Sequence, residues 1–553
     1  MKIGRSNKWI YFIICLLVVF FVISNRHLTS YFFGEVRYHS FNLKPGNSII
    51  PSERSIKWKN NSAFADSIFS FWAGKSLPDW ESDSKTDAPR VLLAKLITRH
   101  KLEETNNLII NLMPHGVSGS KWALNKEGDY DFTITVLTTI LYFFGDYPEI
   151  MYPDTKDHLL NVLLTEAGNK FRDAVPHTLG LVFETENHIL MTEGSRYLKN
   201  RWIALHGNKD AFYDNVQNGM EDKILAFLSE LNTDGLYEFN SNPYIGYTIT
   251  ALLNLEAFAS DKVKTEARKV LDYMNWCYAL GSYNLNHYPP IRRRYEKAGI
   301  QEFANDYQTV FMKSWLSYSP DLNYIPDIGI GNAHALIGAC MPYRPADKAV
   351  EVLFNKGNGY FVQMGHGPVA CPEIYSAGKH FLLSAGGANR GKRSLIVPRP
   401  ITLFLDDNSA NLSEAFHLSG PGTDYMRWNN TGVFKNFACA AGPVTVPSGI
   451  TPLEKGNNWS VFSMKDSVSL VIYSTRNFGL IAIFEDRAYA ALLNEIIKAN
   501  PDQEQLMTHF QFPGGHKIIY NVYSPRNKWV IKSDNEELLE RDFDNWPLID
   551  FKK

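Results

Sequence analysis

Three polar side chains stand where predicted helices begin, a place where an amide, an imidazole and a phenol can meet one ligand. Asn187 and His188 are adjacent, and Tyr244 follows an Asn-Pro dipeptide. An amide can hydrogen-bond to an anion, an imidazole can hold or take a proton near neutral pH, and a phenol can donate one. Because helix N-termini carry partial positive charge and free N–H groups, the ligand expected beside them is anionic.

These residues belong to a run of amphipathic segments between about residues 90 and 347. Apolar residues recur at three- and four-residue intervals, which is typical of helices with one buried face. The segments with this pattern include Val91–Leu112, Phe132–Phe144, His158–Glu166, Glu186–Leu205, Val216–Leu231, Pro243–Ala259, Val263–Tyr278 and Tyr307–Leu316.

Regular spacing links three of these helices. Each of the three follows a residue that can cap a helix, namely Asp131, Thr185 and Asn242. The starts at Phe132, Glu186 and Pro243 are 54 and 57 residues apart, and each interval holds one further helix. A recurring helix pair of this size predicts a toroid of helical hairpins. In such a ring the inner helices run parallel, so residues at their N-termini are expected to face a common cleft.

After about residue 348 the pattern changes to short apolar or alternating runs separated by Gly, Pro, Asn and Asp, which indicates strands. These runs are Gly359–Met364, His380–Ser384, Ile401–Leu405, Ser467–Ser474, Leu480–Phe484, Lys517–Tyr523 and Lys528–Lys532. Strands at this spacing favour an antiparallel β-sandwich. The predicted fold is therefore α+β and multidomain, with a lead-in at residues 25–89, an incomplete α/α toroid at 90–347 and a β-sandwich at 348–553.

Three stretches resemble the alginate-lyase and heparinase II/III-like superfamily of polysaccharide lyases: residues 184–198, residues 237–248, and the Gly-His-Gly-Pro sequence that begins at Gly365. The resemblance implies an incomplete α/α toroid joined to an antiparallel β-sandwich, acting as a lyase on an acidic polysaccharide. In that superfamily an Asn, or an Asn-His pair, stands at one toroid helix start. A catalytic Tyr follows one hairpin later, about the distance between His188 and Tyr244 here.

The chemistry of such lyases explains these residue types. β-Elimination of a uronic acid removes a weakly acidic proton next to a carboxylate, and neutralising the carboxylate stabilises the enolate that develops. The resemblance assigns Asn187 to neutralisation and His188 to the base or to charge stabilisation. It assigns Tyr244 to the acid, or to both acid and base.

The superfamily pattern also includes an Arg shortly before the Tyr, and residues 237–244 contain none. The missing cation is expected from Arg292, Arg293 and Arg294, which lie in a Pro-rich loop. A triple-Arg run is also common on solvated surfaces, so a substrate role and a surface role both stay open.

Further site residues are expected from the β region and from aromatic side chains. Some branches of the superfamily add a histidine from the β domain, for which His366 is the candidate and His287 and His417 are alternatives. Flat rings cover the apolar faces of sugars, and Trp122 and Tyr247 are the expected substrate-binding aromatics.

The N-terminus indicates export. Lys2, Arg5 and Lys8 precede an uncharged apolar run of 15 residues, Trp9–Ile23. This run is short for a membrane span and matches the core of a signal peptide within residues 1–24, with a retained signal anchor as the alternative. The body of the protein is then secreted, periplasmic or membrane-anchored outside the cytoplasm.

Charge and motifs limit the partners and leave three other functions open. With a net charge of −2 the chain lacks the basic stripe or high pI expected of a nucleic-acid binder. The partner that the resemblance implies is an acidic polysaccharide. No cofactor is expected, although a structural Ca²⁺ or Zn²⁺ in the β region stays open. The alternatives are a uronate epimerase, a non-catalytic carbohydrate-binding protein, and a glycoside hydrolase whose carboxylates would come from Asp129, Asp131, Glu186 and Glu238.

Overall fold

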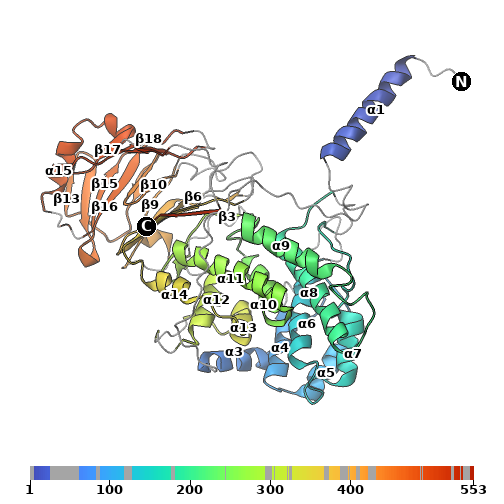
Figure 1. Cartoon of the computed structure of the whole chain (residues 1–553). Coiled ribbons are helices and arrows are strands. Elements are labelled where there is room, and N and C mark those ends of the chain that lie inside the picture. The colour runs from blue at the N-terminus through green and yellow to red at the C-terminus, as the bar shows by residue number, and fades with distance from the viewer. Residues whose placement is uncertain are drawn as a thin grey trace. The chain divides into compact units, whose positions relative to one another are not determined.

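Helices occupy the N-terminal part of the chain and antiparallel sheets the C-terminal part (Figure 1), which confirms the predicted α+β class. The structure is a computed structural model. It describes residues 5–24, 62–81, 87–116, 128–175, 181–242, 244–292, 302–303, 306–319, 322, 327–366, 373–386, 396–397, 399–406, 411–420, 431–485, 487, 490–524, 528–535, 537–539 and 548–552.

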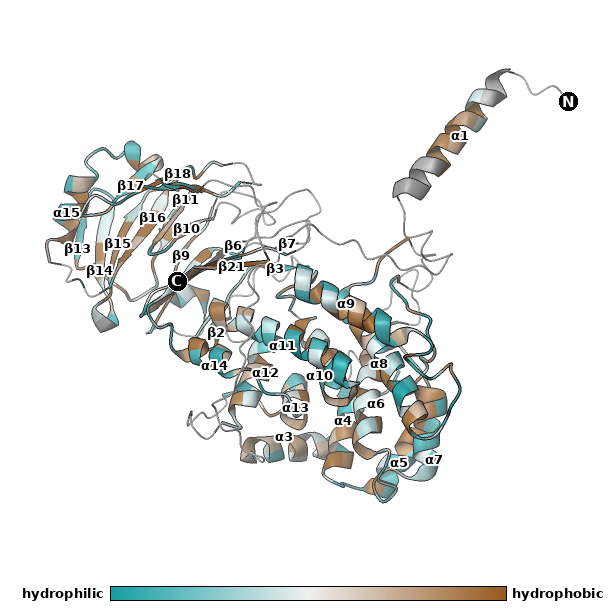
Figure 2. Ribbon diagram, in the orientation of Figure 1, coloured by the Kyte–Doolittle hydropathy of each residue, from teal (hydrophilic) through white to brown (hydrophobic). Residues whose placement is uncertain are grey.

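The helices before the sheets are α1 (Arg5–Ser24), α3 (Ala63–Gly74), α4 (Asp87–Ile97), α5 (Leu102–Ile110), α6 (Asp131–Phe144), α7 (Pro153–His158) with a π-helical turn (Leu159–Leu163), α8 (Glu186–Leu205), α9 (Met220–Asp234), α10 (Ile245–Phe258), α11 (Asp261–Gly281), α12 (Tyr307–Leu316), α13 (Ala333–Cys340) and α14 (Asp347–Phe354). Hydrophobic residues predominate in the coloured part of α1 (Figure 2). Within the described residues, none of the helices has the length and apolar character needed to cross a bilayer.

Helix bounds agree with the sequence pattern in some places and differ in others. The segments predicted for α8 and α12 are observed with the same first and last residues. The predicted helix Val91–Leu112 is instead two helices, because Arg99 and Lys101 adopt positive φ angles of 54° and 48° that interrupt the helical backbone. The helix predicted from Pro243 begins at Ile245, and Pro243 itself lies outside the described residues.

The strands are β1 (Ser282–Tyr283), β2 (Asn286–His287), β3 (Ile291–Arg292), β4 (Tyr360–Met364), β5 (Glu373–Ala377), β6 (Phe381–Gly386), β7 (Ile396–Val397), β8 (Ile401–Leu405), β9 (Phe416–Leu418), β10 (Gly432–Phe434), β11 (Phe437–Ala440), β12 (Val444–Thr445), β13 (Glu454–Gly456), β14 (Trp459–Ser463), β15 (Ser469–Ser474), β16 (Gly479–Phe484), β17 (His509–Gln511), β18 (Lys517–Tyr520), β19 (Ile531–Asp534), β20 (Glu537–Leu538) and β21 (Ile549–Lys552); α15 (Leu492–Ala499) follows β16.

Two large antiparallel sheets share one hydrophobic core. The seven-stranded sheet has the order β12-β9-β8-β6-β5-β4-β21, and the six-stranded sheet has the order β10-β11-β16-β15-β14-β13. Leu383 and Leu403 of the first sheet belong to the same buried cluster as Val461 and Ile481 of the second. A smaller sheet has the order β17-β18-β19-β20, while β1-β2 and β3-β7 form two-stranded ribbons.

Strand pairing positions several polar residues. In the β4–β5 pair Met364 lies opposite Glu373, so His366, just after β4, and Glu373 are brought to the same end of that pair. In the β3–β7 pair Ile291 lies opposite Val397. This pairing holds the 288–292 segment beside the chain that leads to Arg399.

The chain divides into two compact units. The first unit comprises residues 1–40, 72–227 and 258–263, and the second comprises 41–71, 228–257 and 264–553. In the first unit α6 packs against α4 and α8. The predicted domain boundary at residue 90 falls within α4 and the one at residue 348 within α14, whereas the units divide the helical part itself; those boundaries stay predictions.

A buried lysine ties together helix ends in the second unit. Nζ of Lys356 donates to the carbonyl oxygens of Ala279, Ser282 and Val352 at 3.0, 2.5 and 2.8 Å. Lys356→Met would leave these three acceptors unsatisfied, so we expect the free energy of unfolding to fall by about 2–4 kcal/mol. Urea unfolding measures this change. Lys348→Met in the same helix region should cost less than about 1 kcal/mol, and an equal loss in both variants would contradict the carbonyl argument.

Candidate functional site

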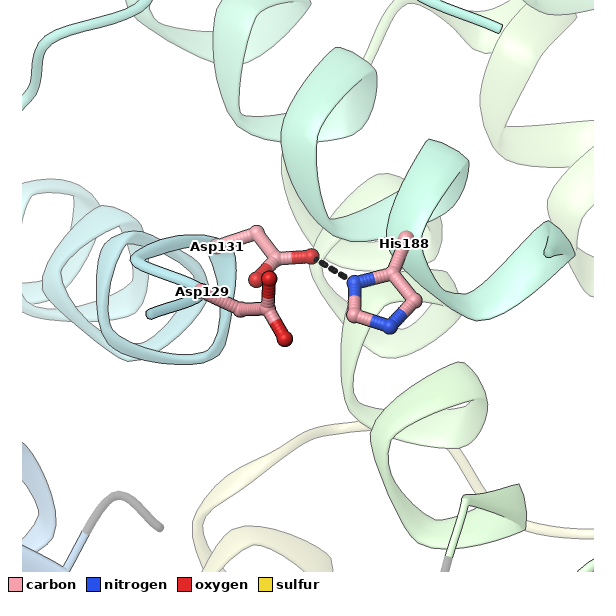
Figure 3. Close-up of side chains that lie close together, drawn as sticks. All are labelled: Asp129, Asp131 and His188. Atoms are coloured by element: carbon pink, nitrogen blue, oxygen red, sulfur yellow. Dashed lines mark hydrogen bonds and ion pairs between the residues drawn. The ribbon is translucent and has the colours of Figure 1, made fainter. Parts of the chain in front are cut away.

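His188, in the first turn of α8, is held by carboxylates within the first unit. Its Nδ1 lies 2.5 Å from Oδ2 of Asp131, the first residue of α6, and 3.9 Å from Oε2 of Glu184. The ring of Phe132 packs edge-on against the imidazole, with ring centroids 5.3 Å apart. Figure 3 shows the carboxylates of Asp129 and Asp131 next to each other, with Asp131 directed at the imidazole. A short hydrogen bond and an aromatic contact therefore fix the orientation of His188.

The surrounding carboxylates determine the charge of His188. Burial alone would lower its pKa, but Asp131, through its charge and its hydrogen bond, and then Glu184 and Asp129 raise the pKa to about 10. Burial raises the pKa of Glu184 to about 7, although the charge on His188 opposes this rise. His188 is therefore an imidazolium at neutral pH. Of its two predicted roles, charge stabilisation fits this state, whereas accepting a proton does not.

The same residues have the donor atoms of a metal site. Asp129, Asp131 and His188 each offer one donor atom, and these atoms lie within 4.8 Å of one another. Carboxylate and imidazole donors can hold a divalent ion such as Zn²⁺ or Mn²⁺. However, the 2.5 Å contact between His188 and Asp131 is a hydrogen-bond distance, and two ligands of one ion usually lie about 3 Å or more apart. The cluster forms a hydrogen-bonded ion pair as it stands.

Asn187 points away from solvent, unlike the sequence prediction. Its side chain is fully buried, and its Oδ1 accepts a hydrogen bond from Oγ1 of Thr185. Among the described residues its Nδ2 has no hydrogen-bond partner. Thr185 uses its hydroxyl for this contact, so it occupies the N-cap position of α8 without a side-chain cap bond. The buried amide does not support the predicted contact of Asn187 with a substrate carboxylate.

A pocket in the second unit lies at the start of α10. The lining residues come from the segment before α10 and its first turn, from the chain between β2 and β3, from the segment before α12 and its first turn, and from the β region. They are Asn240, Asn242, Ile245, His287, Tyr288, Pro289, Ile291, Glu302, Asp306, Gln308 and Arg399. Tyr244 lies in sequence between two lining residues and is half-buried. Its carbonyl oxygen accepts the N–H groups of Tyr247 and Thr248 at 3.0 and 3.2 Å, so Tyr244 precedes the helix instead of lying in its first turn.

One imidazole of the pocket is paired with a carboxylate. Nδ1 of His287 lies 2.7 Å from Oδ2 of Asp306. The other oxygen of Asp306 accepts the backbone N–H of Thr309 at 2.7 Å and so caps α12. The backbone N–H of His287 donates to the carbonyl of Phe303 at 2.9 Å. Both partners of this pair are therefore fixed by backbone hydrogen bonds.

The arginine of the pocket is Arg399. It is 6 % exposed, its guanidinium lies 4.3 Å from the ring centroid of Tyr288, and its Nη1 donates to the Tyr288 hydroxyl at 2.8 Å. Arg292 was the predicted cation; it is buried, and its guanidinium packs over the ring of Tyr237 at 4.3 Å. It does not line the pocket. Arg293 and Arg294, together with Trp122, lie outside the described residues.

His366 is connected to the pocket through a carboxylate. Its Nε2 lies 2.8 Å from Oε1 of Glu373, and its ring stacks on Phe239 with centroids 4.0 Å apart. The same oxygen of Glu373 accepts Nδ2 of Asn240, a lining residue, at 2.8 Å, and Tyr375 donates to the other oxygen. His366 is buried and is not itself a lining residue.

The other predicted residues are buried or half-buried. Tyr247 is buried against the ring of His334, with centroids 5.2 Å apart, so the predicted stacking of Tyr247 on a sugar is not supported. His417 in β9 is half-buried, with its Nδ1 3.3 Å from the carbonyl of Ala415. The carboxylates considered for a hydrolase are also engaged: Asp129 and Asp131 belong to the His188 cluster, and Glu186 and Glu238 are buried.

The sequence prediction omitted Arg399, Asp306 and Glu373. Asp306 stands in a short stretch that resembles the start of α6, which could have singled it out. Arg399 lies between two prolines, and Glu373 has no local signal. Comparison with known proteins adds no assignment, since no family model matches the chain and no curated protein is significantly similar to it in sequence.

Proposed function

We propose that the protein is a polysaccharide lyase that cleaves an acidic, uronate-containing polysaccharide by β-elimination. The observation that carries this proposal is the pocket at the start of α10, which combines a buried guanidinium with an imidazole. Tyr244 stands in the sequence between the lining residues Asn242 and Ile245. A cation to neutralise a carboxylate, a base and an acid are the groups that the reaction needs.

Each group has a role in the proposed reaction. Arg399 binds the carboxylate of the uronate and so supplies the cation that residues 237–244 lack. A guanidinium pre-oriented by the ring and hydroxyl of Tyr288 can hold a carboxylate through two parallel hydrogen bonds. Tyr244 protonates the departing glycosidic oxygen. His366 positions Asn240 through Glu373, at the edge of the same pocket.

We also propose a finer fold, an incomplete α/α toroid followed by a β-sandwich. Paired helices before residue 348 support an incomplete α/α toroid, and two antiparallel sheets with one shared core support a β-sandwich. The basic, apolar N-terminus supports export of the enzyme from the cytoplasm to the outside, where polysaccharide substrates are found.

The proposal is tested by incubating the protein with alginate, hyaluronan, chondroitin, heparan and algal uronides. We expect at least one substrate to give products that absorb in the ultraviolet as unsaturated uronides. New reducing ends without this absorbance would indicate a hydrolase, and an inverted uronate without cleavage would indicate an epimerase. Binding without turnover on every substrate would favour the non-catalytic alternative.

Replacing the pocket guanidinium tests the role of Arg399. Arg399→Gln should lower kcat/KM by roughly 10²–10³-fold, because a neutral amide cannot neutralise the carboxylate in the transition state. Arg268→Gln is the matched control: Arg268 also lies over a tyrosine ring, that of Tyr343 at 5.3 Å, but outside the pocket. Equal activity of the Arg399 variant and wild type, with both folded by circular dichroism, would remove Arg399 from the mechanism.

A further inference from the structure

We propose that His287, oriented by Asp306, is the base that removes the proton from C5 of the uronate; this inference rests on the proposed lyase function. His287 is the one imidazole among the described residues that line the pocket. β3, which begins four residues after His287, pairs with β7, which ends two residues before Arg399. The other histidines considered above are engaged elsewhere or lie outside the pocket.

The hydrogen bond to Asp306 selects the useful tautomer. A carboxylate can only accept a hydrogen bond. The 2.7 Å contact between Nδ1 of His287 and Oδ2 of Asp306 therefore places the proton of a neutral His287 on Nδ1. The lone pair is then on Nε2, where it can accept a proton. The same division of roles between a carboxylate and an imidazole operates in Ser-His-Asp hydrolases.

The surroundings hold the pair rigidly. The ring of Tyr278 packs against the imidazole, with centroids 4.9 Å apart and planes at 62°. Asp306 is fixed by its bond to the N–H of Thr309 at the start of α12. His287 is 5 % exposed, so its imidazole is largely shielded from bulk water, and the residue lines the pocket. Because such a base is already oriented and desolvated, little further free energy is needed to place it in the transition state.

The competing imidazoles are less suited to accept a proton. His188 already carries one at neutral pH, because Asp131 and two further carboxylates hold its pKa near 10. His366 directs Nε2 at Glu373 and stacks on Phe239, outside the lining of the pocket.

In the elimination, each bond that breaks is matched by a bond that forms. The C5–H proton moves to Nε2 of His287, and the electrons of that bond form the C4=C5 double bond. The C4–O bond breaks, and the departing oxygen takes the phenolic proton of Tyr244. Exchange with water then returns the proton of the imidazolium to solvent and a proton to the phenolate. No oxidant, reductant or second substrate is required.

Two variants separate a catalytic His287 from a structural one. His287→Ala should lower kcat by about 10²–10⁴-fold, and free imidazole added to this variant should restore part of the activity. Asp306→Asn keeps the N-cap, because Asn caps helices as well as Asp does, but it replaces the carboxylate with an amide that can hold the wrong tautomer. We expect kcat of this variant to fall by 10-fold or more with an unchanged KM and unchanged thermal unfolding.

The control uses another histidine–aspartate pair. His206 lies 2.7 Å from Asp146 on the surface of the first unit, and His206→Gln should keep wild-type kcat. Full activity of His287→Ala in an active wild-type background overturns the assignment of the base alone. If His287→Ala fails to fold, wild-type kcat in Asp306→Asn overturns it as well. Absence of any unsaturated product from the wild type overturns the lyase function, and the assignment of the base with it.

Discussion

Tyr244→Phe is expected to lower kcat for unsaturated-product formation by about 10²–10⁴-fold while KM changes little. The variant removes only the hydroxyl that would protonate the departing oxygen. Phenylalanine retains the ring and the backbone carbonyl that accepts the N–H groups of Tyr247 and Thr248, so the start of α10 should form as before. Initial rates from ultraviolet absorbance, measured over a range of substrate concentrations, separate kcat from KM.

The size of this effect depends on how good the leaving group is. A substrate with an acidic aryl leaving group needs less protonation at the departing oxygen, so the difference between Tyr244→Phe and wild type should shrink on it. Tyr523→Phe, which alters an exposed tyrosine, should match wild type on both substrates. A Tyr244→Phe variant that is folded and fully active on a polysaccharide would assign the acid role to another group.

Local signals predict helix positions well where capping and periodicity coincide. The start of α12 follows from Asp306, whose side chain accepts the N–H of Thr309 as an N-cap should. They fail where the backbone breaks without a local signal. Arg99 and Lys101 take left-handed angles with no glycine or proline nearby, so periodicity alone joins α4 and α5 into one helix.

Site residues are predictable only as far as they depend on local sequence. His188 and Tyr244 were identified because helix starts have recognisable neighbours. The pairing of His287 with Asp306 and the placement of Arg399 depend on β3 meeting β7 and on α12 beginning beside β2. Those contacts are set by tertiary packing, which overrides local preference. The cation was therefore predicted at residues 292–294, whereas the arginine that lines the pocket is Arg399.

The contribution of the His188 cluster to the free energy of unfolding is expected to fall as pH rises from about 5 to about 10. Glu184 titrates near pH 7 in the folded state, above its usual 4.5, and His188 titrates near 10, above its usual 6.5. Over these ranges the folded state binds more protons than the unfolded chain, so raising the pH favours unfolding. The Glu184 step, between about pH 4.5 and 7, is worth at most about 3 kcal/mol, and the His188 step, between about 6.5 and 10, is of similar or larger size.

Substitutions within the cluster should remove these steps separately. Glu184→Gln cannot ionise, so the decline between pH 5 and 7 should become shallower than in wild type, while the contribution of His188 above pH 7 remains. Glu193 and Glu230, whose pKa values burial also raises to about 7, keep part of the decline in this variant. His188→Gln should flatten the decline above pH 7, and Asp131→Asn should do the same by removing the charge that keeps His188 protonated. Urea unfolding at pH 5, 7 and 9 measures both slopes. Glu104→Gln, which changes an exposed ion pair with Lys101, should keep the wild-type slopes. An unchanged slope in all three cluster variants would show that His188 is not held as a buried imidazolium.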